Sequence, residues 1–176
     1  NSLGSSWEPR KRTLKALAER AVELAPQFKA RDVSNALMAA ARMQHPSLVL
    51  LAERLEDCLA DVAWEANAQE LTIIFWALAT SRASEEASKA AALPEKRWRP
   101  LREAAMQLVG SFNGQNVSNA LWAMGKLRRG GSAEDKRLLE ALEGRAVELA
   151  QTFTAQGLTN TVWGLAKAGA TLSRTS

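Results

Sequence analysis

The sequence is poor in the side chains that build disulfides, zinc sites and histidine-dependent active sites. Its 176 residues include one cysteine, Cys58, and one histidine, His45. A single cysteine excludes a disulfide within the chain and any metal site with several cysteine ligands. A single histidine has no second imidazole with which to form a zinc site or a catalytic dyad. A reducing compartment fits this composition.

Tyrosine is absent, and runs of Val, Ile and Thr are rare. Much of the 47% hydrophobic content is Ala and Leu, which favours helices over sheets. The ten glycines and five prolines stand mostly between apolar-periodic stretches, where they punctuate the chain. No apolar run approaches the roughly 18 residues needed to span a membrane.

Residues for catalysis are also missing as a set. There is no nucleophile–base pair, no Gly-rich phosphate loop of the usual spacing and no convergence of carboxylates. Glu53, Glu56, Asp57 and Asp61 share one helix, and we expect them to form a solvated acidic face. The sequence therefore predicts a protein that is not an enzyme and that has no cofactor, no metal and no small-molecule substrate.

What is present is an internal repeat. Four segments align, and they are Phe28–Arg42, Ala66–Thr80, Phe112–Lys126 and Phe153–Lys167. The preceding stretches repeat too, because residues 16–28 and 141–153 are identical at nine of thirteen positions. Self-similarity at this period is typical of helical repeat proteins, whose two-helix units bury their apolar faces by stacking.

Each repeat is predicted to be a helix A, a tight turn and a helix B. The fold class is therefore all-α, as a right-handed α-solenoid of about four helix–turn–helix repeats with eight main helices. The approximate repeats are residues 11–43, 46–81, 97–128 and 135–169, with insertions at 82–96 and 129–134. The first insertion is expected to hold a partial helix.

Helix boundaries have their own signals. Helix A is predicted over Thr13–Gln27 in the first repeat, while Pro46 and Pro100 are expected at the first helical position of the second and third. Asn67, Asn113 and Thr154 are the predicted caps of three B helices, and Asn67 forms a capping box with Glu70. Lys29 breaks this pattern. Neither end shows a polar capping repeat and Asn1 is not a Met, so we expect a single solenoid segment of a longer protein.

The best copies of the helix B motif, Gln115–Ala123 and Gln156–Gly164, resemble the signature of the octotricopeptide repeat family. The resemblance covers roughly residues 11–170, and the 38-residue step between the first two repeats is that family's usual length. It implies an organellar RNA-binding α-solenoid that acts on transcripts or belongs to a mitochondrial ribosome. The mitochondrion (its matrix) is favoured over the chloroplast stroma.

Positions i, i+4, i+7 and i+11 of helix B lie along one face. Amides there can bond base edges, aromatics can stack on bases, and Lys or Arg can meet phosphates. This stripe combines polar, amide, aromatic and basic positions, and its candidate RNA contacts are Arg31, Asn35, Arg42, Gln115, Asn119, Lys126, Gln156, Asn160 and Lys167.

Two of these residue types have a competing interpretation. Trp76, Trp122 and Trp163 stand beside Ala or Gly, which favours packing between repeats, as for the aligned Phe28, Phe112 and Phe153. The three aligned asparagines could equally bond the backbone of the neighbouring repeat in a buried ladder.

Basic residues also cluster outside the stripes. Arg10–Arg12 precedes the first repeat. Around the third repeat the candidate phosphate contacts are Arg97, Arg99, Arg102, Arg128 and Arg129. Trp98, between two arginines, combines stacking with charge, although charge runs at loop ends are often only solvated.

The leading hypothesis is a non-catalytic protein that binds and stabilises or positions single-stranded or ribosomal RNA within a ribonucleoprotein complex. The alternative is a protein–protein scaffold subunit of a large organellar complex. Charge divides accordingly: residues 1–88 carry 10 basic and 12 acidic residues (−2), and residues 89–176 carry 13 and 7 (+6). The basic half suits RNA, and the acidic half suits a protein partner.

Overall fold

The structure, a computed structural model, describes residues 7–82 and 93–169, with side chains from residue 11 onward. These ranges contain helices and turns and no strand, which confirms the all-α fold class. The α-helices are α1 (Trp7–Leu24), α2 (Ala30–Met43), α3 (Val49–Asp57), α4 (Leu59–Val62), α5 (Ala68–Ser81), α7 (Glu95–Leu108), α8 (Gly114–Lys126), α9 (Ala133–Glu148) and α10 (Ala155–Gly169).

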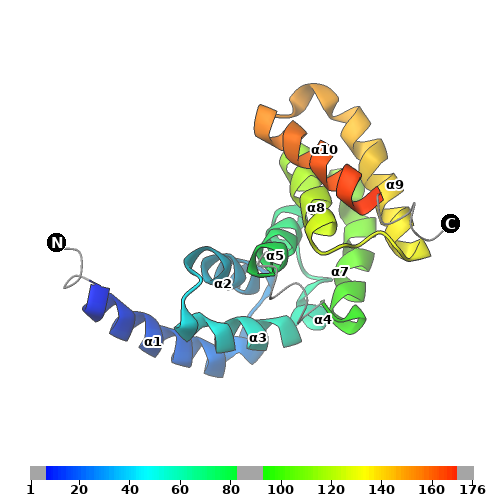
Figure 1. Cartoon of the computed structure of the whole chain (residues 1–176). Helices are drawn as coiled ribbons and strands as arrows, with labels where there is room; N and C mark the ends of the chain where they lie inside the picture. Colours follow the sequence, from blue (N-terminus) through cyan, green and yellow to red (C-terminus); the bar gives the residue numbers. More distant parts are fainter. Residues whose placement is uncertain (1–6, 83–92, 170–176) are drawn as a thin grey trace.

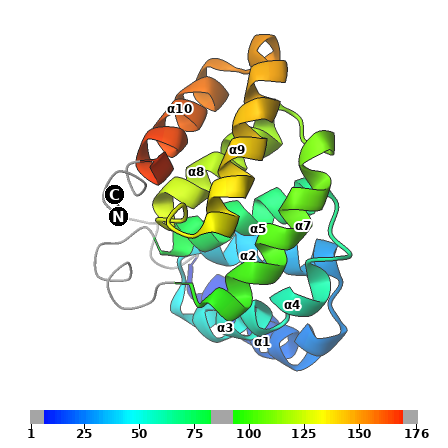
Figure 2. The same ribbon diagram turned by 90° about the vertical axis from the view of Figure 1, so that its right-hand side faces the viewer.

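The helices form two curved layers. The predicted B helices α2, α5, α8 and α10 pack on one another in sequence order. The predicted A helices α1, α3 with α4, α7 and α9 follow a parallel course outside them. Figure 1 shows the B helices along the inner side of the curve, and Figure 2 shows the same two layers from the side.

The B helices begin where their caps predict. The Asn67 side chain accepts a hydrogen bond from Glu70 N at 3.0 Å, and the Glu70 carboxylate accepts one from Asn67 N at 3.1 Å. Asn113 accepts from Asn116 N at 2.9 Å. Thr154 Oγ1 accepts from Gly157 N at 3.1 Å. These bonds satisfy backbone N–H groups that the first helical turn leaves free.

The start of the first B helix, α2, is capped differently. Lys29 offers no capping oxygen, and instead the Asp32 carboxylate accepts from Lys29 N at 3.1 Å. The turn at Lys29 therefore differs from the others, as predicted. Its side chains satisfy one backbone N–H group, whereas the capping box at Asn67 satisfies two.

The A helices depart from prediction in three places. Helix α1 begins at Trp7, six residues before Thr13. In the second repeat Pro46 is at the first helical position as predicted, in a 3₁₀ turn (Pro46–Leu48) that runs into α3, but the helix is interrupted at Cys58. Pro100 lies inside α7, which begins at Glu95 directly after Pro94, so Pro94 rather than Pro100 marks its start. The partial helix expected in the first insertion concerns residues 83–92, which lie outside the described residues.

Close approach between α8 and α10 depends on glycine. A Cβ on Gly164 would lie 2.4 Å from the Leu121 carbonyl oxygen and 2.8 Å from Trp122 N. Both distances are far below van der Waals contact, so only a residue without a side chain fits there. The core itself is aliphatic and aromatic, and its largest fully buried members include Trp98, Phe75 and Phe112.

Candidate nucleic-acid interface

The predicted stripe residues lie on the inner layer. Arg31, Arg42 and Asn35 are exposed on α2, and Gln115 and Lys126 are exposed on α8. On α10, Gln156 and Lys167 are exposed. Asn119 and Asn160 are half-buried. The stripe positions of three repeats are therefore accessible from the side of the molecule that the B helices line.

A groove separates the first turns of α8 and α10. It has a volume of about 460 Å³. The side chains that line it are mostly amides and hydroxyls, and they include Gln115, Ser118, Asn119, Thr154, Gln156 and Asn160. The structure thus brings together four sequence-predicted candidates from two different repeats.

The base of this groove is shaped by small residues. Gly114 and Gly157 line it, and a Cβ on Gly157 would lie 3.2 Å from Thr154 Oγ1 and 3.3 Å from a Phe153 ring carbon. Side chains at these positions would narrow the groove. The width of the groove therefore depends on these two glycines, each of which occurs at its position in one repeat only.

Two of the amide side chains that line the groove have no hydrogen-bond partner within the protein. Within the part of the chain that the structure describes, the side chains of Asn119 and Asn160 make no hydrogen bond. They do not form the buried ladder that was one of the two interpretations of these positions. Their polar atoms are not buried, so water or a ligand can bond them.

A different amide links the repeats. Asn116 Nδ2 donates to Thr72 Oγ1 at 2.9 Å and to the Ala68 carbonyl at 3.4 Å, which ties α8 to α5. Asn116 is three residues before Asn119 and faces the preceding B helix. Sequence reasoning missed it because an Asp, a Glu and a Gly occupy the aligned positions.

Cations stand over the aligned tryptophans. Lys126 Nζ lies 5.1 Å from the ring centroid of Trp163 and 5.6 Å from that of Trp122. Arg42 lies 5.6 Å from the ring of Trp76. The three tryptophans are half-buried, so each packs between repeats with part of its ring and leaves the remainder accessible. The packing interpretation is therefore confirmed for part of each ring, and base stacking on the rest stays a prediction.

The basic cluster around α7 is used inside the protein. Trp98 is fully buried and its Nε1 donates to Asp135 at 2.7 Å. Arg102 is also buried, with Nη1 2.7 Å from Glu95 and 3.2 Å from Asp135. Burial lowers the pKa of Arg102, but its hydrogen bonds to Glu95 and Asp135 outweigh that effect and raise the pKa.

Arg129 belongs to the same cluster. It pairs with Glu95 at 3.0 Å, donates to the Leu93 carbonyl and lies 5.3 Å from the Trp98 ring. Trp98, Arg102 and Arg129 are therefore corrected from RNA contacts to residues that join α7 to the start of α9. The sequence could not show this, because the acids that hold them are 7 to 37 residues away.

Arg97 is engaged as well. Its guanidinium contacts Glu56 at 2.7 Å and Asp57 at 2.6 Å, and Arg82 contacts Glu56 at 2.6 Å. Glu56 is buried, so the expectation that the four acids of this helix form one solvated face is wrong for Glu56. Arg99 and Arg128 remain exposed, and Arg99 is 3.8 Å from Glu103.

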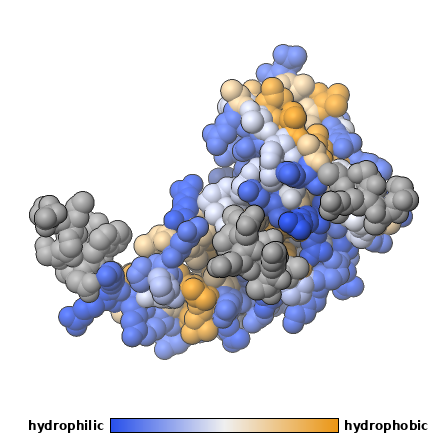
Figure 3. Space-filling model, viewed as in Figure 1, coloured by the Kyte–Doolittle hydropathy of each residue, from blue (hydrophilic) through white to orange (hydrophobic). Residues whose placement is uncertain are grey.

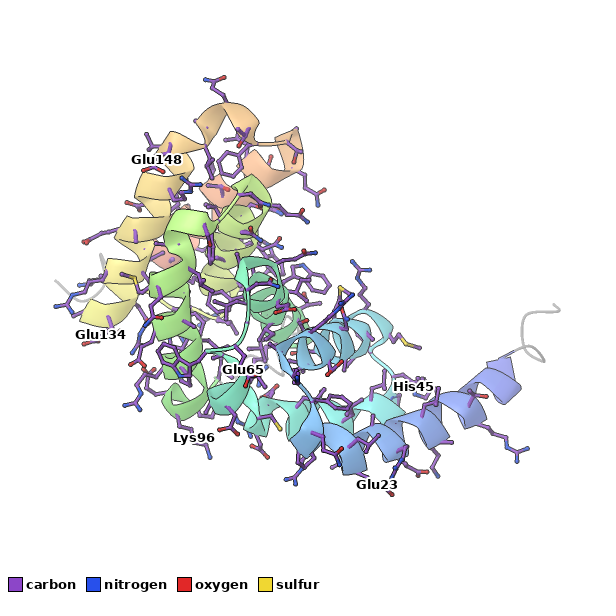
Figure 4. All side chains as sticks on the ribbon, turned by 180° about the vertical axis from the view of Figure 1, so that it is seen from behind. Glu23, His45, Glu65, Lys96, Glu134 and Glu148 are labelled. Atoms are coloured by element: carbon purple, nitrogen blue, oxygen red, sulfur yellow. The ribbon has the colours of Figure 1, made fainter. Side chains whose placement is uncertain are left out.

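The remaining charge favours the inner layer for a polyanion. By sequence the four B helices hold four basic residues and two acidic ones, and α8 and α10 hold no acid. Both acids, Asp32 and Glu70, are engaged in the first turns of their helices. By contrast α9 carries five acids, and Figure 4 places Glu134 and Glu148 at its two ends on the side away from α10.

Within the described ranges, His, Cys, Asp and Glu nowhere gather in a group of three that could hold a metal ion. Among the same residues no helix has the length and hydropathy to cross a membrane. The His45 ring instead accepts a hydrogen bond from Ser47 N at 3.2 Å, at the start of the second repeat.

Comparison with known proteins identifies one family. The model described as RNA-editing substrate-binding complex 6 protein matches residues 11–172, nearly the whole chain. The complex of that description is mitochondrial, so the predicted mitochondrial location is confirmed. Members of this family are non-catalytic, RNA-binding scaffold subunits of that complex. No curated protein matches the chain.

This match corrects the resemblance drawn from the B-helix motif. The family is not the octotricopeptide repeat family, and neither a chloroplast nor a ribosomal assignment is supported. The motif misleads because its Trp and small residues pack neighbouring helix pairs against each other. The same physical demands arise in more than one family of helical repeats.

Proposed function

We propose that this chain, which belongs to the RNA-editing substrate-binding complex 6 protein family, binds single-stranded RNA along the inner layer of B helices. The observation that carries the proposal is the groove between α8 and α10. There four amide side chains predicted from the sequence, two from each repeat, line one groove, and the cation–tryptophan contacts of Lys126 lie further along the same two helices. In this role the chain positions RNA within the complex and performs no chemistry on it.

The groove suits an unpaired base better than a duplex. Amides carry both donors and acceptors, so Asn119 and Asn160 can bond the exposed edge of a base that is splayed out of its strand. The accessible part of Trp163 offers a stacking surface nearby. Lys126, Lys167, Arg42 and Arg31 would then meet the phosphates, and this contribution is independent of sequence.

The third and fourth repeats are the proposed centre of binding. Arg31, Asn35 and Arg42 give the first repeat polar and basic groups without an aromatic partner of their own. The second repeat presents Ile73 and Thr80 where the others have an amide and a cation. We expect it to contribute least.

The architecture behind this proposal is one continuous α-solenoid segment. The order of packing α2, α5, α8 and α10 supports it, since each B helix contacts the one before and the one after. The right-handed sense of the solenoid, the four repeat boundaries and a place within a longer protein remain predictions.

The test is a fluorescence-anisotropy titration of a labelled single-stranded RNA at several salt concentrations. The groove variant is Asn119→Ala with Asn160→Ala. A matched control, Gln27→Ala with Gln107→Ala, removes two exposed amides from the outer layer. We expect the groove variant to bind at least about 10-fold more weakly, since hydrogen bonds to two amides contribute about 1 kcal/mol each.

Lys126→Gln tests the proposed phosphate contact separately from the proposed base contacts. It should flatten the slope of log K against log salt by about 0.7, the value for one phosphate contact on a single strand. Equal losses in the groove variant and its control, with both proteins folded, would place RNA elsewhere on the molecule. Absence of RNA binding at low salt would contradict the proposal and leave the protein-scaffold alternative.

That alternative has one structural observation in its favour. Apolar side chains are exposed on the A helices, and they include Val49 and Leu50 of α3 and Met106 of α7. A scaffold role would use this outer layer and leave the inner layer free, so the two functions are compatible on one molecule.

A further inference from the structure

A second cleft lies at the other end of α8 from the groove. It has a volume of about 540 Å³ and is bounded by the ends of α5 and α8 and by the starts of α7 and α9. It shares no lining residue with the groove. In Figure 3 the surface near the end of α8 is strongly hydrophilic. We call this site the loop cleft, and its charged lining residues are Arg82, Glu95, Lys126, Arg128, Arg129 and Asp135.

Both acids of the loop cleft are already neutralised within the protein. Glu95 contacts Arg102 at 2.7 Å and Arg129 at 3.0 Å. Asp135 is buried and contacts Arg102 at 3.2 Å. Neither carboxylate is therefore left to repel an anion that enters the cleft.

Two cations of the loop cleft have no acid to neutralise them. Among the described residues neither Lys126 nor Arg128 forms an ion pair, whereas Arg82 contacts Glu56 at 2.6 Å. Four cations and two acids line the cleft, which gives a net charge of +2. Arg102 and Glu56, which pair with lining residues, cancel each other in this sum. The surplus charge therefore lies on Lys126 and Arg128, two residues apart.

The backbone holds Arg128 in a conformation that favours glycine. Helix α8 ends in a Schellman motif, in which Arg129 N donates to the Met124 carbonyl at 2.8 Å and Arg128 N donates to the Gly125 carbonyl at 3.4 Å. Arg128 is the left-handed residue of this motif, with φ of 53°. Glycine usually fills this position because it has no Cβ to clash. The end of the helix does not need an arginine here, so the exposed guanidinium is available for a partner.

We propose that the loop cleft binds the terminal phosphate of an RNA strand. A terminal phosphate is a monoester with a charge of about −1.5 to −2 at neutral pH, which matches the two surplus cations. An internal phosphate carries a single negative charge. The Arg128 guanidinium can donate two parallel hydrogen bonds to phosphate oxygens, and Lys126 adds a point charge. This inference rests on the proposed function, because it places one end of the strand at the last turn of α8.

The test is a fluorescence-anisotropy comparison of three RNAs of one sequence, labelled on an internal base. They carry a 5′-phosphate, a 3′-phosphate or hydroxyl groups at both ends. We expect at least one phosphorylated RNA to bind about 10-fold more tightly than the hydroxyl-ended RNA, the effect of one additional charge-assisted contact. The end that gives the gain is the one that the cleft holds.

Arg128→Gln should abolish this preference, because Lys126 alone leaves one surplus charge. Arg99→Gln is the matched control, since it removes one positive charge from an exposed position on α7, and it should keep the preference. Arg128→Gly should lose the preference without a lower unfolding temperature, since glycine suits the left-handed backbone. Equal affinities for the three RNAs would overturn the proposal, as would a preference that survives in Arg128→Gln.

Inorganic phosphate separates this inference from the proposed function. At constant ionic strength it should raise the unfolding temperature of the unchanged protein more than that of Arg128→Gln. That result without any RNA binding would contradict the proposed function and support the cleft as a phosphate site. RNA binding that depends on the groove amides but not on the terminal phosphate would support the proposed function and overturn the inference about the cleft.

Discussion

Lys126 at the end of α8 lies over the ring of Trp163 in the next B helix, with 5.1 Å between Nζ and the ring centroid. Arg42 has the same relationship to Trp76 two repeats earlier in the chain, at 5.6 Å. Each contact joins the last turn of one B helix to the middle of the next. A cation held in this way is fixed in place yet still faces solvent, which is the arrangement that a phosphate contact needs.

The second repeat lacks this cation, and restoring it is a test of the pattern. Thr80 occupies the aligned position, and its hydroxyl is buried without a hydrogen-bond partner among the described residues. Thr80→Lys would place an ammonium group near Trp122. We expect the salt dependence of RNA binding to steepen by about 0.7 in log–log slope. Ser81→Lys adds the same charge one residue away. An equal change in salt dependence from Ser81→Lys would show that the position of the added charge does not matter.

Gly164 is predicted to be the least replaceable glycine. Gly164→Ala would drive a Cβ into the Leu121 backbone, so α8 and α10 would have to separate. We expect a loss of about 1–3 kcal/mol in the free energy of unfolding, as for other overpacked sites. Urea denaturation measures it.

The matched control for that variant is Gly144→Ala on α9, where an added Cβ meets nothing within 4 Å. Because alanine favours helix more than glycine does, this change should stabilise the protein by about 0.5–1 kcal/mol. Similar free energies of unfolding in the two variants would mean that α8 and α10 can move apart at little cost.

Asp135 is predicted to hold the third and fourth repeats together. It accepts hydrogen bonds from Trp98 Nε1 and Arg102 Nη1, and all three residues are buried. Asp135→Ala leaves a buried guanidinium and a buried indole N–H short of a partner, which should cost about 3–5 kcal/mol. Thermal unfolding followed by tryptophan fluorescence reports it. Glu134→Ala, at an exposed neighbour, should leave the unfolding temperature nearly unchanged.

Two arginines of α7 should behave oppositely when replaced. Arg97→Gln removes one of the two cations that neutralise the buried Glu56, and we expect a loss of about 1–3 kcal/mol in stability. Arg99→Gln changes only an exposed pair with Glu103 and should stay within about 0.5 kcal/mol. Chemical denaturation of both variants decides the matter. Equal stabilities would remove Arg97 from the structural network and return it to the candidate RNA contacts.

Cys58 is predicted to be a slow thiol. Burial raises its pKa, Asp61 and Asp57 raise it further, and Arg54 opposes them. Less thiolate is then present at neutral pH, and thiolate is the reactive form. Alkylation by iodoacetamide should follow a pH profile displaced to higher pH than that of the same chain unfolded in urea. Coincident profiles would show that the folded environment does not act on the thiol.

Features set by neighbours along the chain could be predicted from the sequence. The four-fold repeat, the alternation of two helices and the caps at Asn67, Asn113 and Thr154 follow from residue types a few positions apart. The predicted start of α7 at Pro100 was wrong, because a proline suits a first helical turn but the helix begins earlier, at Glu95 directly after Pro94. The stripe residues of the groove were found because helical spacing alone places them on one face.

Contacts between distant residues were decided by the tertiary structure. Arg97 and Arg99 are nearly equivalent in the sequence, yet two residues on a helix turn the side chain through about 200°, so one faces Glu56 and the other faces water. Trp98 is buried because Asp135, 37 residues later, satisfies its indole. Sequence determined which residues form each helix and which face they share. Only the stacking of repeats determined which charges were neutralised within the protein and which remained for a partner.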